Sequence, residues 1–576
     1  MIIELLVAPG LAYVVWTLVC LEINVRRARA MGVPVIRLPV DYNNLLWVAL
    51  SPFLFKFLDR LPFKWSSYPD FLRNSRRGYH FYEGSKPFEK LGPVWAQVTP
   101  VNICLHFADP QASKEIFARR RDFLRPIEEY KLLEVYGPSL TTAGSEDWPR
   151  HRKVLAAPFM NESIMSFVWE ESIRQAESMV KSWTKAGEEG VSSIQKDTRT
   201  LSLNVLASIA LRKSFSFHGS SDPPQDVSEA NVYRDSLQTV LDNIVLLILV
   251  PYRFLSSRWV PQSWQKISRA SLAFQNYMKA TIERESERVI QEGKAGSGGA
   301  GLLTGFVHAL ETHKREISNV NADLKQEKRG LSMEEVMGNF FIINFAGHDT
   351  TANTLAFATL ALVANPDVQA WVAEEINIVV PVDDGMEQCD YNTIYPKLKR
   401  CRAVMLETLR LYPPVNAIPK VNKTTQTISV RDQKLVIQPG VKETISIYAT
   451  QVHPAYWGPT STKWDPKRWI LNPAPSPPTI EQLEREEMYV PDELIFFPWS
   501  EGPMSCPGKK LSEVEFVATV ACLLRRCRIS VKGEKGVDSK GGRNDTKRMV
   551  EEVMNNVNSD LLLRMENADA VRVLYR

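Results

Sequence analysis

The sequence predicts a mainly α-helical protein with a small β portion (α+β), in which one large domain follows an N-terminal membrane anchor. Three observations support this fold class. Helical periodicity covers most of the chain, the strand-like segments are few, short and clustered, and no regular βαβ alternation occurs. The expected organisation is an anchor over residues 1–24, a basic, proline-rich hinge over 25–64 and a single domain over 65–576.

Composition sets the broad class of the protein. The 576 residues are 44% hydrophobic, which is enough for a large buried core, and the net charge of +4 does not indicate a nucleic-acid partner. The seven cysteines are scattered, odd in number and contain no CxxC pair. This pattern argues against a disulfide framework or a zinc site and favours a reducing compartment.

The N-terminus carries the predicted anchor. Residues 5–21 contain no charge, and their length is near the lower limit for a spanning helix, which needs about 20 residues. Arg26, Arg27 and Arg29 follow directly, so the large domain should lie on the cytosolic side. A cleaved signal peptide is the alternative, although no basic region precedes the apolar run. Two shorter apolar segments, 45–58 and 244–255, are candidates for further membrane contact, and the second could equally be core.

The remaining elements follow from periodicity. Helices are predicted over residues 160–185, 227–250, 264–291, 332–364, 366–378, 396–411 and 508–526. Strands are predicted over Trp95–Thr99, Ile103–Phe107, Thr427–Val430, Lys434–Ile437 and Thr444–Ile447. The glycine-rich segment 291–301 is predicted to be a flexible linker.

A single cysteine stands at the mouth of the helix 508–526. In the segment FPWSEGPMSCPGKK, Pro507 suits the first helical turn, and the free N–H groups and dipole of that turn favour a thiolate at Cys506. A thiolate is a soft metal ligand or a nucleophile. A free cysteine is more often an inert core residue, so the local pattern leaves both interpretations open.

The helix 332–364 is apolar nearly all round, yet polar residues interrupt its middle. Ser332 and Glu335 form a capping box at its start. In the middle of the helix, Gly347 lowers helix stability, and the carboxylate of Asp349 is costly to bury without a partner. The Thr350 hydroxyl can form a hydrogen bond to the backbone carbonyl four residues earlier. Any one of them could be an ordinary polar kink. Together they indicate a notch able to receive protons.

Two further motifs place charged groups close together. Glu407 and Arg410 share one helix face, and Arg468 lies between tryptophans in a later loop, so one carboxylate clamped by two guanidiniums could form a buried staple. A surface ion pair of little energetic value is the alternative. Trp148 and Arg152 could direct an indole N–H and a guanidinium at one anion, or could simply begin a basic helix.

Taken together, these motifs resemble those of the cytochrome P450 family of haem-thiolate monooxygenases. The positions of the family's cysteine motif are occupied by Trp499, Gly502, Met504, Cys506 and Gly508. Residues 346–350 match its oxygen-activation motif, and residues 407–410 match its Glu-x-x-Arg motif. Trp148 and Arg152 match its Trp-x-x-x-Arg element, so the motifs occur in the family's order over residues 148–508.

The resemblance implies a P450 fold that holds haem b (iron protoporphyrin IX) between the central helix and the cysteine loop of a haem-thiolate catalytic domain. It implies Cys506 as the axial ligand of the haem iron. The catalytic residues Asp349 and Thr350 would deliver protons to dioxygen, and Gly347 would leave room for that molecule. The remaining implied roles are propionate binding for Trp148, Arg152 and Lys420, and a structural role for Glu407, Arg410 and Arg468.

The resemblance also implies an activity and its partners. The expected function is insertion of one oxygen atom from O2 into a lipophilic substrate, by hydroxylation or epoxidation, in secondary metabolite biosynthesis as in fungal members. NADPH electrons would come from a partner cytochrome reductase that docks near Lys509 and Lys510. The expected location is the endoplasmic reticulum membrane with the catalytic domain in the cytosol, and no nucleic acid is involved. The substrate walls are expected at residues 130–142, at Ile342, Phe345 and Ala346, and at residues 415–418.

Two positions depart from the family pattern. Met504 stands where the family has arginine, so a charge-assisted hydrogen bond worth roughly 1.5–3 kcal/mol would be missing at the propionates. Trp499 replaces the phenylalanine that shields the sulfur, and its N–H needs a partner. Two other functions stay open: a haem-thiolate isomerase or dehydratase that uses no O2, and a non-enzymatic haem sensor.

Overall fold

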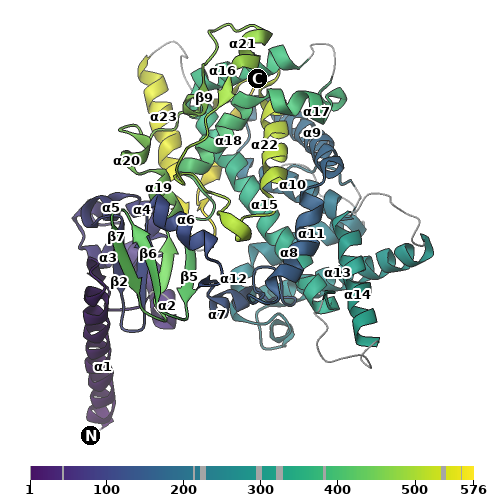
Figure 1. Cartoon of the computed structure of the whole chain (residues 1–576). Coiled ribbons are helices and arrows are strands. Elements are labelled where there is room, and N and C mark those ends of the chain that lie inside the picture. The colour runs from purple at the N-terminus through teal and green to yellow at the C-terminus, as the bar shows by residue number, and fades with distance from the viewer. Residues whose placement is uncertain are drawn as a thin grey trace.

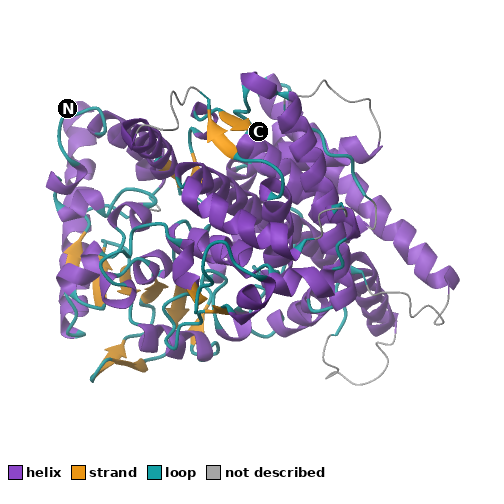
Figure 2. Cartoon of the chain, turned by 90° about the horizontal axis from the view of Figure 1, so that it is seen from above, coloured by secondary structure: helices purple, strands orange, loops and turns teal. Residues whose placement is uncertain are grey.

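The computed structural model describes residues 2–41, 44–211, 214–220, 229–292, 301–318, 329–380, 385–532, 540–559 and 561–576. Figure 1 shows a large helical body with a smaller sheet beside it, and a long N-terminal helix that projects away from both. Figure 2, a view from above, shows most strands gathered toward one side of the helices. The predicted class, mainly α with a small clustered β portion, is confirmed.

The predicted helices form close to their expected bounds. They are α9 (Glu162–Lys185), α11 (Glu229–Asp242), α12 (Ile244–Leu249), α13 (Gln262–Glu292), α15 (Met333–Ala364), α16 (Pro366–Val379), α18 (Lys399–Leu411) and α22 (Lys509–Leu524). The sequence prediction missed α10 (Ile194–Leu211), α14 (Leu302–Ser318) and α23 (Lys540–Asn555), whereas α8 (Trp148–Phe159) begins where a basic helix start was considered. Most of the predicted linker at 291–301 lies outside the described residues.

Helix α15 runs through the centre of the helical body (Figure 1). Its predicted capping box is present, because the Ser332 hydroxyl accepts from the Glu335 N–H and the Glu335 carboxylate accepts from the Ser332 N–H. Most of its side chains are buried, as expected for a helix that is apolar on all sides. Gly347, Asp349 and Thr350 in its middle are half-buried, and Asp349 and Thr350 border cavities beside the helix.

The main sheet has six strands in the order β1-β2-β3-β8-β5-β4. These strands are β1 (Val35–Arg37), β2 (Val94–Val98), β3 (Ile103–Phe107), β4 (Phe123–Leu124), β5 (Ile418–Asn422) and β8 (Lys442–Ile445). Strands β6 (Gln426–Val430) and β7 (Gln433–Ile437) form a separate hairpin. Antiparallel pairing of β5 with β8 sets Lys420 directly opposite Glu443, beside the site described below.

The N-terminal region departs from the predicted division into anchor and hinge. Helix α1 (Ile2–Ala30) continues past residue 24, because Val25 and Ala28 are buried in the apolar core next to β2 and β3. Within the predicted hinge, β1 pairs in parallel with β2, and residues 45–58 form the helix α2 (Leu45–Leu58). Among the described helices, none is by itself long and apolar enough to cross a membrane; only α15 and α16, bent by 110°, pass that test as a pair.

Candidate active site

The cysteine loop is held in a tight shape by its backbone. Gly502 has φ +72°, and a Cβ there would lie 2.9 Å from the carbonyl oxygen of Phe117, so this position requires glycine. The Cys506 N–H donates to the Trp499 carbonyl at 2.8 Å, which closes the loop before α22 begins. These contacts fix Cys506 at the helix mouth, where the sequence places it.

The helix mouth acts on the thiol in the expected direction, but burial opposes it. The Gly508 N–H and the charge of Arg152 both favour the thiolate, but the surrounding protein desolvates the sulfur and raises the pKa of Cys506 above its usual value. Desolvation by the protein around the cavity outweighs these two contributions. A cation bound at the sulfur would favour the thiolate.

Cys506 opens into a cavity of about 330 Å³ whose walls are mostly apolar. Predicted wall residues that do line it are Tyr130, Thr141, Phe345, Ala346, Val415 and Ile418. Further lining residues that the sequence prediction missed include Arg125, Met405, Leu409, Pro414, Ile447 and Leu562. Ile342 was also expected there, but it is buried in the helical core.

Three cations stand at or beside this cavity, and one of them, Lys420, has the buried carboxyl group of Glu443 opposite it in the sheet. Arg125 donates to the carbonyls of Leu140 and Thr141, and Arg152 donates to the Ser505 carbonyl at 2.7 Å. Lys420 is buried, and its closest polar contact is the Met504 sulfur at 3.9 Å. Within the described residues, none of these three cations forms an ion pair. Burial and the nearby charge of Arg125 lower the pKa of Lys420 to about 8, and burial likewise lowers the pKa of Arg125.

The Trp148 side chain offers a further unused donor. It is buried at the start of α8, and its indole N–H has no hydrogen-bond partner in the described structure. Arg152 lies one turn later on the same helix, and its guanidinium reaches the cysteine loop. Orphaned buried donors and unpaired cations are costly unless a bound group satisfies them. A ligand with carboxylate groups would fit this set.

The polar residues of α15 do not all face the same side. Thr350 lines the cavity with Cys506, and its hydroxyl donates to the Ala346 carbonyl at 2.8 Å, as its position predicts. Gly347 instead faces α10, where an added Cβ would lie 2.8 Å from a methyl group of Leu206. The expectation that Gly347 leaves room in the cavity is therefore wrong. Its small size allows α10 and α15 to approach each other closely.

Asp349 does not line the Cys506 cavity but a second one. It lines an outer cavity of about 680 Å³ together with Lys196, Arg199 and Arg564. The Arg199 Nε atom donates to its carboxylate at 2.7 Å, and the Arg199 Nη1 atom donates to Asp242 of α11 at 2.9 Å. The nearby positive charges outweigh burial and hold the pKa of Asp349 below its usual value. Arg199 was missed by the sequence prediction, because 150 residues separate it from its partner.

Glu407, Arg410 and Arg468 form the compact cluster that the sequence suggests. Arg410 binds the Glu407 carboxylate through two nitrogens at 2.8 and 2.9 Å, and Arg468 reaches the same carboxylate at 3.0 Å. The indole N–H of Trp469 and the backbone N–H of Asp465 also donate to it. Glu407 and Arg410 are fully buried, and every charge in the cluster has a partner. The cluster lies outside the Cys506 cavity.

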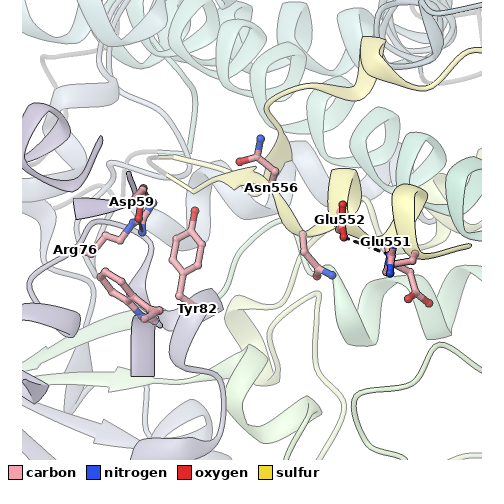
Figure 3. Close-up of a pocket in the computed structure, with 9 residues that line it drawn as sticks. Asp59, Arg76, Tyr82, Glu551, Glu552 and Asn556 are labelled. Carbon is pink, nitrogen blue, oxygen red and sulfur yellow. Dashed lines mark hydrogen bonds and ion pairs between the residues drawn. The ribbon is translucent and has the colours of Figure 1, made fainter. Parts of the chain in front are cut away.

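A different cavity, of about 670 Å³, lies near the surface between the N-terminal segments and α23. Figure 3 shows Asp59, Arg76 and Tyr82 on one side and Glu551, Glu552 and Asn556 on the other. Both Nη atoms of Arg76 bind Asp59 at 3.0 Å, and its guanidinium lies 4.3 Å from the centre of the Tyr82 ring. The cation in this cavity is thus already satisfied, in contrast to those near Cys506.

The residues around Cys506 fit a haem. They supply a soft sulfur ligand, unpaired cations and an orphaned indole N–H for two propionates, and apolar walls for a porphyrin. Trp148, Arg125, Arg152 and Lys420 are the residues that could hold the propionates. Met504 occupies the position where the family has an arginine. Arg125 supplies a cation that the sequence prediction did not include.

Comparisons with known proteins agree with this geometry. The family profile for Cytochrome P450 matches residues 76–550. The chain is 28% identical to the phomenoic acid biosynthesis cluster cytochrome P450 monooxygenase of Leptosphaeria maculans, over 89% of this chain and 90% of that protein. It is 30% identical to cytochrome P450 monooxygenase 124 of Postia placenta, over 76% of this chain and 77% of that protein. A crystal structure of a cytochrome P450 superposes with a TM-score of 0.59 at 16% identity and covers 85% of this chain and 96% of that one.

Proposed function

The chain belongs to the cytochrome P450 family and is a monooxygenase of that family, and from this premise we propose that it is membrane-attached and oxidises a lipophilic small molecule. The reaction is hydroxylation or epoxidation with one oxygen atom from O2. The cofactor would be haem b, and the Cys506 sulfur would be the protein ligand of its iron. One observation carries the proposal: a single cavity brings together the Cys506 sulfur, the Thr350 hydroxyl, unpaired cations and apolar walls.

The residues around that cavity would have different roles in holding the haem. A haem bound there supplies the oxidising chemistry, and an anionic sulfur ligand favours cleavage of the O–O bond. Trp148, Arg125 and Lys420 would orient the group by its carboxylates. Cys506 would be held as a thiolate by the bound cation, against the desolvation that otherwise raises its pKa.

Asp349 and Thr350 together offer a path for protons across α15. Asp349 borders the outer, polar cavity, and Thr350 borders the inner one, although they are adjacent in sequence. Asp349 would accept protons at its carboxylate from the outer side and pass them toward the Thr350 hydroxyl. Arg199 holds the carboxylate in its anionic form and in place, so it acts as a positioning residue.

The walls and the relatives support an apolar substrate from secondary metabolism. Phe345, Leu409 and Ile447 present apolar surface to the cavity, and no described carboxylate lines it. Apolar walls with few polar groups suit a lipophilic molecule. The Leptosphaeria maculans relative is named for a biosynthesis cluster, which supports a role in secondary metabolite biosynthesis for this chain.

Exposed apolar surface supports attachment to the endoplasmic reticulum membrane. Helix α1 presents an exposed apolar face that includes Leu11, Trp16 and Leu18, and it projects from the body (Figure 1). On α2, Leu46, Leu50, Phe53 and Phe57 are exposed at helical spacing along one face. An NADPH-dependent reductase would supply electrons at the face that carries Lys509 and Lys510. The catalytic domain then lies on the cytosolic side.

The direct test is the absorption spectrum of the reduced, carbon-monoxide-bound protein, beside a Cys506→Ser variant. A strongly red-shifted Soret band in the wild type that is lost in the variant is the expected result. Absence of any haem band after haem supplementation would reject the proposal. Product formation that stops on Thr350→Ala while haem stays bound would separate a monooxygenase from an isomerase or a haem sensor.

A further inference from the structure

Trp499 is held from two sides by residues of α22. Its indole N–H donates to the Ser512 hydroxyl at 3.2 Å, and that hydroxyl donates in turn to the Lys509 carbonyl at 2.7 Å. The Lys509 ammonium lies 5.2 Å from the centre of the indole ring. The indole N–H, for which the sequence required a partner, is thus satisfied by Ser512.

The clamped ring adjoins the cysteine. Trp499 and Cys506 both line the same cavity, and the Cys506 N–H donates to the Trp499 carbonyl at 2.8 Å. Because the indole N–H is bound to Ser512, it is not available to the Cys506 sulfur. The Gly508 N–H is the backbone donor to that sulfur. The Trp499 indole therefore does not withdraw electron density from the sulfur through a hydrogen bond.

We propose that Lys509 and Ser512 clamp Trp499 and thereby set the reduction potential of the haem bound at Cys506, with the Lys509 charge raising that potential. This proposal rests on the proposed haem-thiolate function. A cation is attracted to an aromatic face, so the ring holds the ammonium at one place beside the cysteine loop. A positive charge there stabilises the reduced centre, which carries one more negative charge than the oxidised centre. Lys509 is exposed, so salt should weaken the effect.

Lys510 provides a matched control at the same end of α22. It is the next residue and also a surface lysine, but its ammonium is paired with Glu162. A lysine that acts only as general surface charge should behave like Lys510. A lysine that acts through its place on the Trp499 ring should not.

The experiment is a mediated redox titration of the haem-loaded protein for the wild type, Lys509→Gln, Lys509→Arg and Lys510→Gln, at low and high salt. Lys509→Gln is expected to shift the midpoint potential to more negative values, by more than Lys510→Gln does. Lys509→Arg should restore the wild-type value, because it keeps both charge and stacking. High salt should reduce the difference between Lys509→Gln and the wild type.

Equal shifts in Lys509→Gln and Lys510→Gln, or failure of Lys509→Arg to restore the potential, would overturn the role of Lys509. Ser512→Ala should release the indole N–H and move the Soret band of the carbon monoxide complex. An unchanged band and potential in Ser512→Ala would overturn the role of Ser512. A wild type that binds no haem would reject the proposed function, and this proposal with it.

Discussion

Two groups of buried cations lie on different sides of α18 and reach opposite arrangements. Around Glu407, both arginines bind one carboxylate, and carbonyls and an indole N–H fill the remaining positions. Around the Cys506 cavity, the described residues offer Arg125 and Arg152 carbonyl oxygens, and offer Lys420 a thioether and the carboxyl group of Glu443 on the next strand, but no ion pair forms among them. A buried charge that is fully paired indicates structure, whereas a group of unpaired cations indicates a missing anionic ligand.

The largest expected effect is a loss of stability on substitution of Glu407, the carboxylate that pairs the two arginines. Glu407→Gln removes the charge that Arg410 and Arg468 share, and it leaves two guanidiniums without a counter-charge. Breaking a buried pair in this way costs roughly 3–5 kcal/mol, so the variant should unfold at a much lower temperature or fail to accumulate as soluble protein. Thermal unfolding monitored by circular dichroism measures this.

Glu551→Gln is the matched control for that substitution. Glu551 makes a single loose contact with Lys547 at 3.9 Å on the exposed side of α23, and it should change stability little. If Glu407→Gln and Glu551→Gln unfold alike, the Glu407 cluster does not have the structural role assigned to it.

Asp349 is an intermediate case, because its carboxylate is paired yet borders a cavity. Asp349→Asn keeps the shape and leaves Arg199 bound to Asp242, so stability should change little. Loss of a group that transfers protons should lower turnover by about 10²–10⁴-fold. Turnover per bound haem, measured with an oxidised probe substrate, checks this, and the red-shifted carbon monoxide spectrum should remain. Unchanged turnover would remove Asp349 from the proton path.

Substitutions in the group of cations around the Cys506 cavity should reduce haem binding rather than the stability of the protein. Arg125→Gln and Lys420→Gln should each weaken haem binding by ~1.5–3 kcal/mol, the value of a charge-assisted hydrogen bond. The haem-free protein should lose little stability, because neither cation forms an ion pair among the described residues and because the Glu443 carboxyl opposite Lys420 can stay protonated, its pKa being raised to about 8 by burial. Haem titration and thermal unfolding of the same samples provide both measurements.

Arg76 is the control for that pair of variants. It lies in the surface cavity of Figure 3, bound to Asp59 and stacked on Tyr82, so Arg76→Gln should lower stability without affecting haem binding. Variants at Arg125 or Lys420 that behave like Arg76→Gln would contradict the distinction between paired and unpaired cations.

A proton is a third way to satisfy a buried charge, and its effect appears only as a dependence of stability on pH. Glu515 on α22 is buried with only the Ser202 hydroxyl as a side-chain partner, and burial raises its pKa to about 8. The unfolded chain releases this proton near its ordinary pKa of about 4.5, so the free energy of unfolding should fall between that pH and pH 8, and then level off.

Glu515→Gln should therefore flatten the pH dependence of stability and be more stable than the wild type at pH 8. Denaturant unfolding at several pH values between 5 and 8, a range of about three units, measures the slope. A slope equal to that of the wild type would show that Glu515 is ionised in the folded protein.

The sequence predicts the helices well because each long helix repeats its apolar residues within its own segment. The same periodicity does not tell which cavity a polar residue of a buried helix faces. Successive residues on a helix point about 100° apart, so Asp349 faces the outer cavity and Thr350 the inner one. Only the packing of α10 on α15 shows that Gly347 faces Leu206. Arg125 lies in a loop without periodicity, and the folded chain alone places it beside Lys420.

The most direct test of the account compares haem with its dimethyl ester as ligands of the haem-free protein. The two have the same iron and ring, but the ester lacks the carboxylate charges. The account predicts that the wild type prefers haem by at least the value of one charge-assisted hydrogen bond, ~1.5–3 kcal/mol, and that the double variant Arg125→Gln/Lys420→Gln loses this preference. Equal affinity of the wild type for both ligands would contradict the claim that the unpaired cations bind the cofactor's carboxylates.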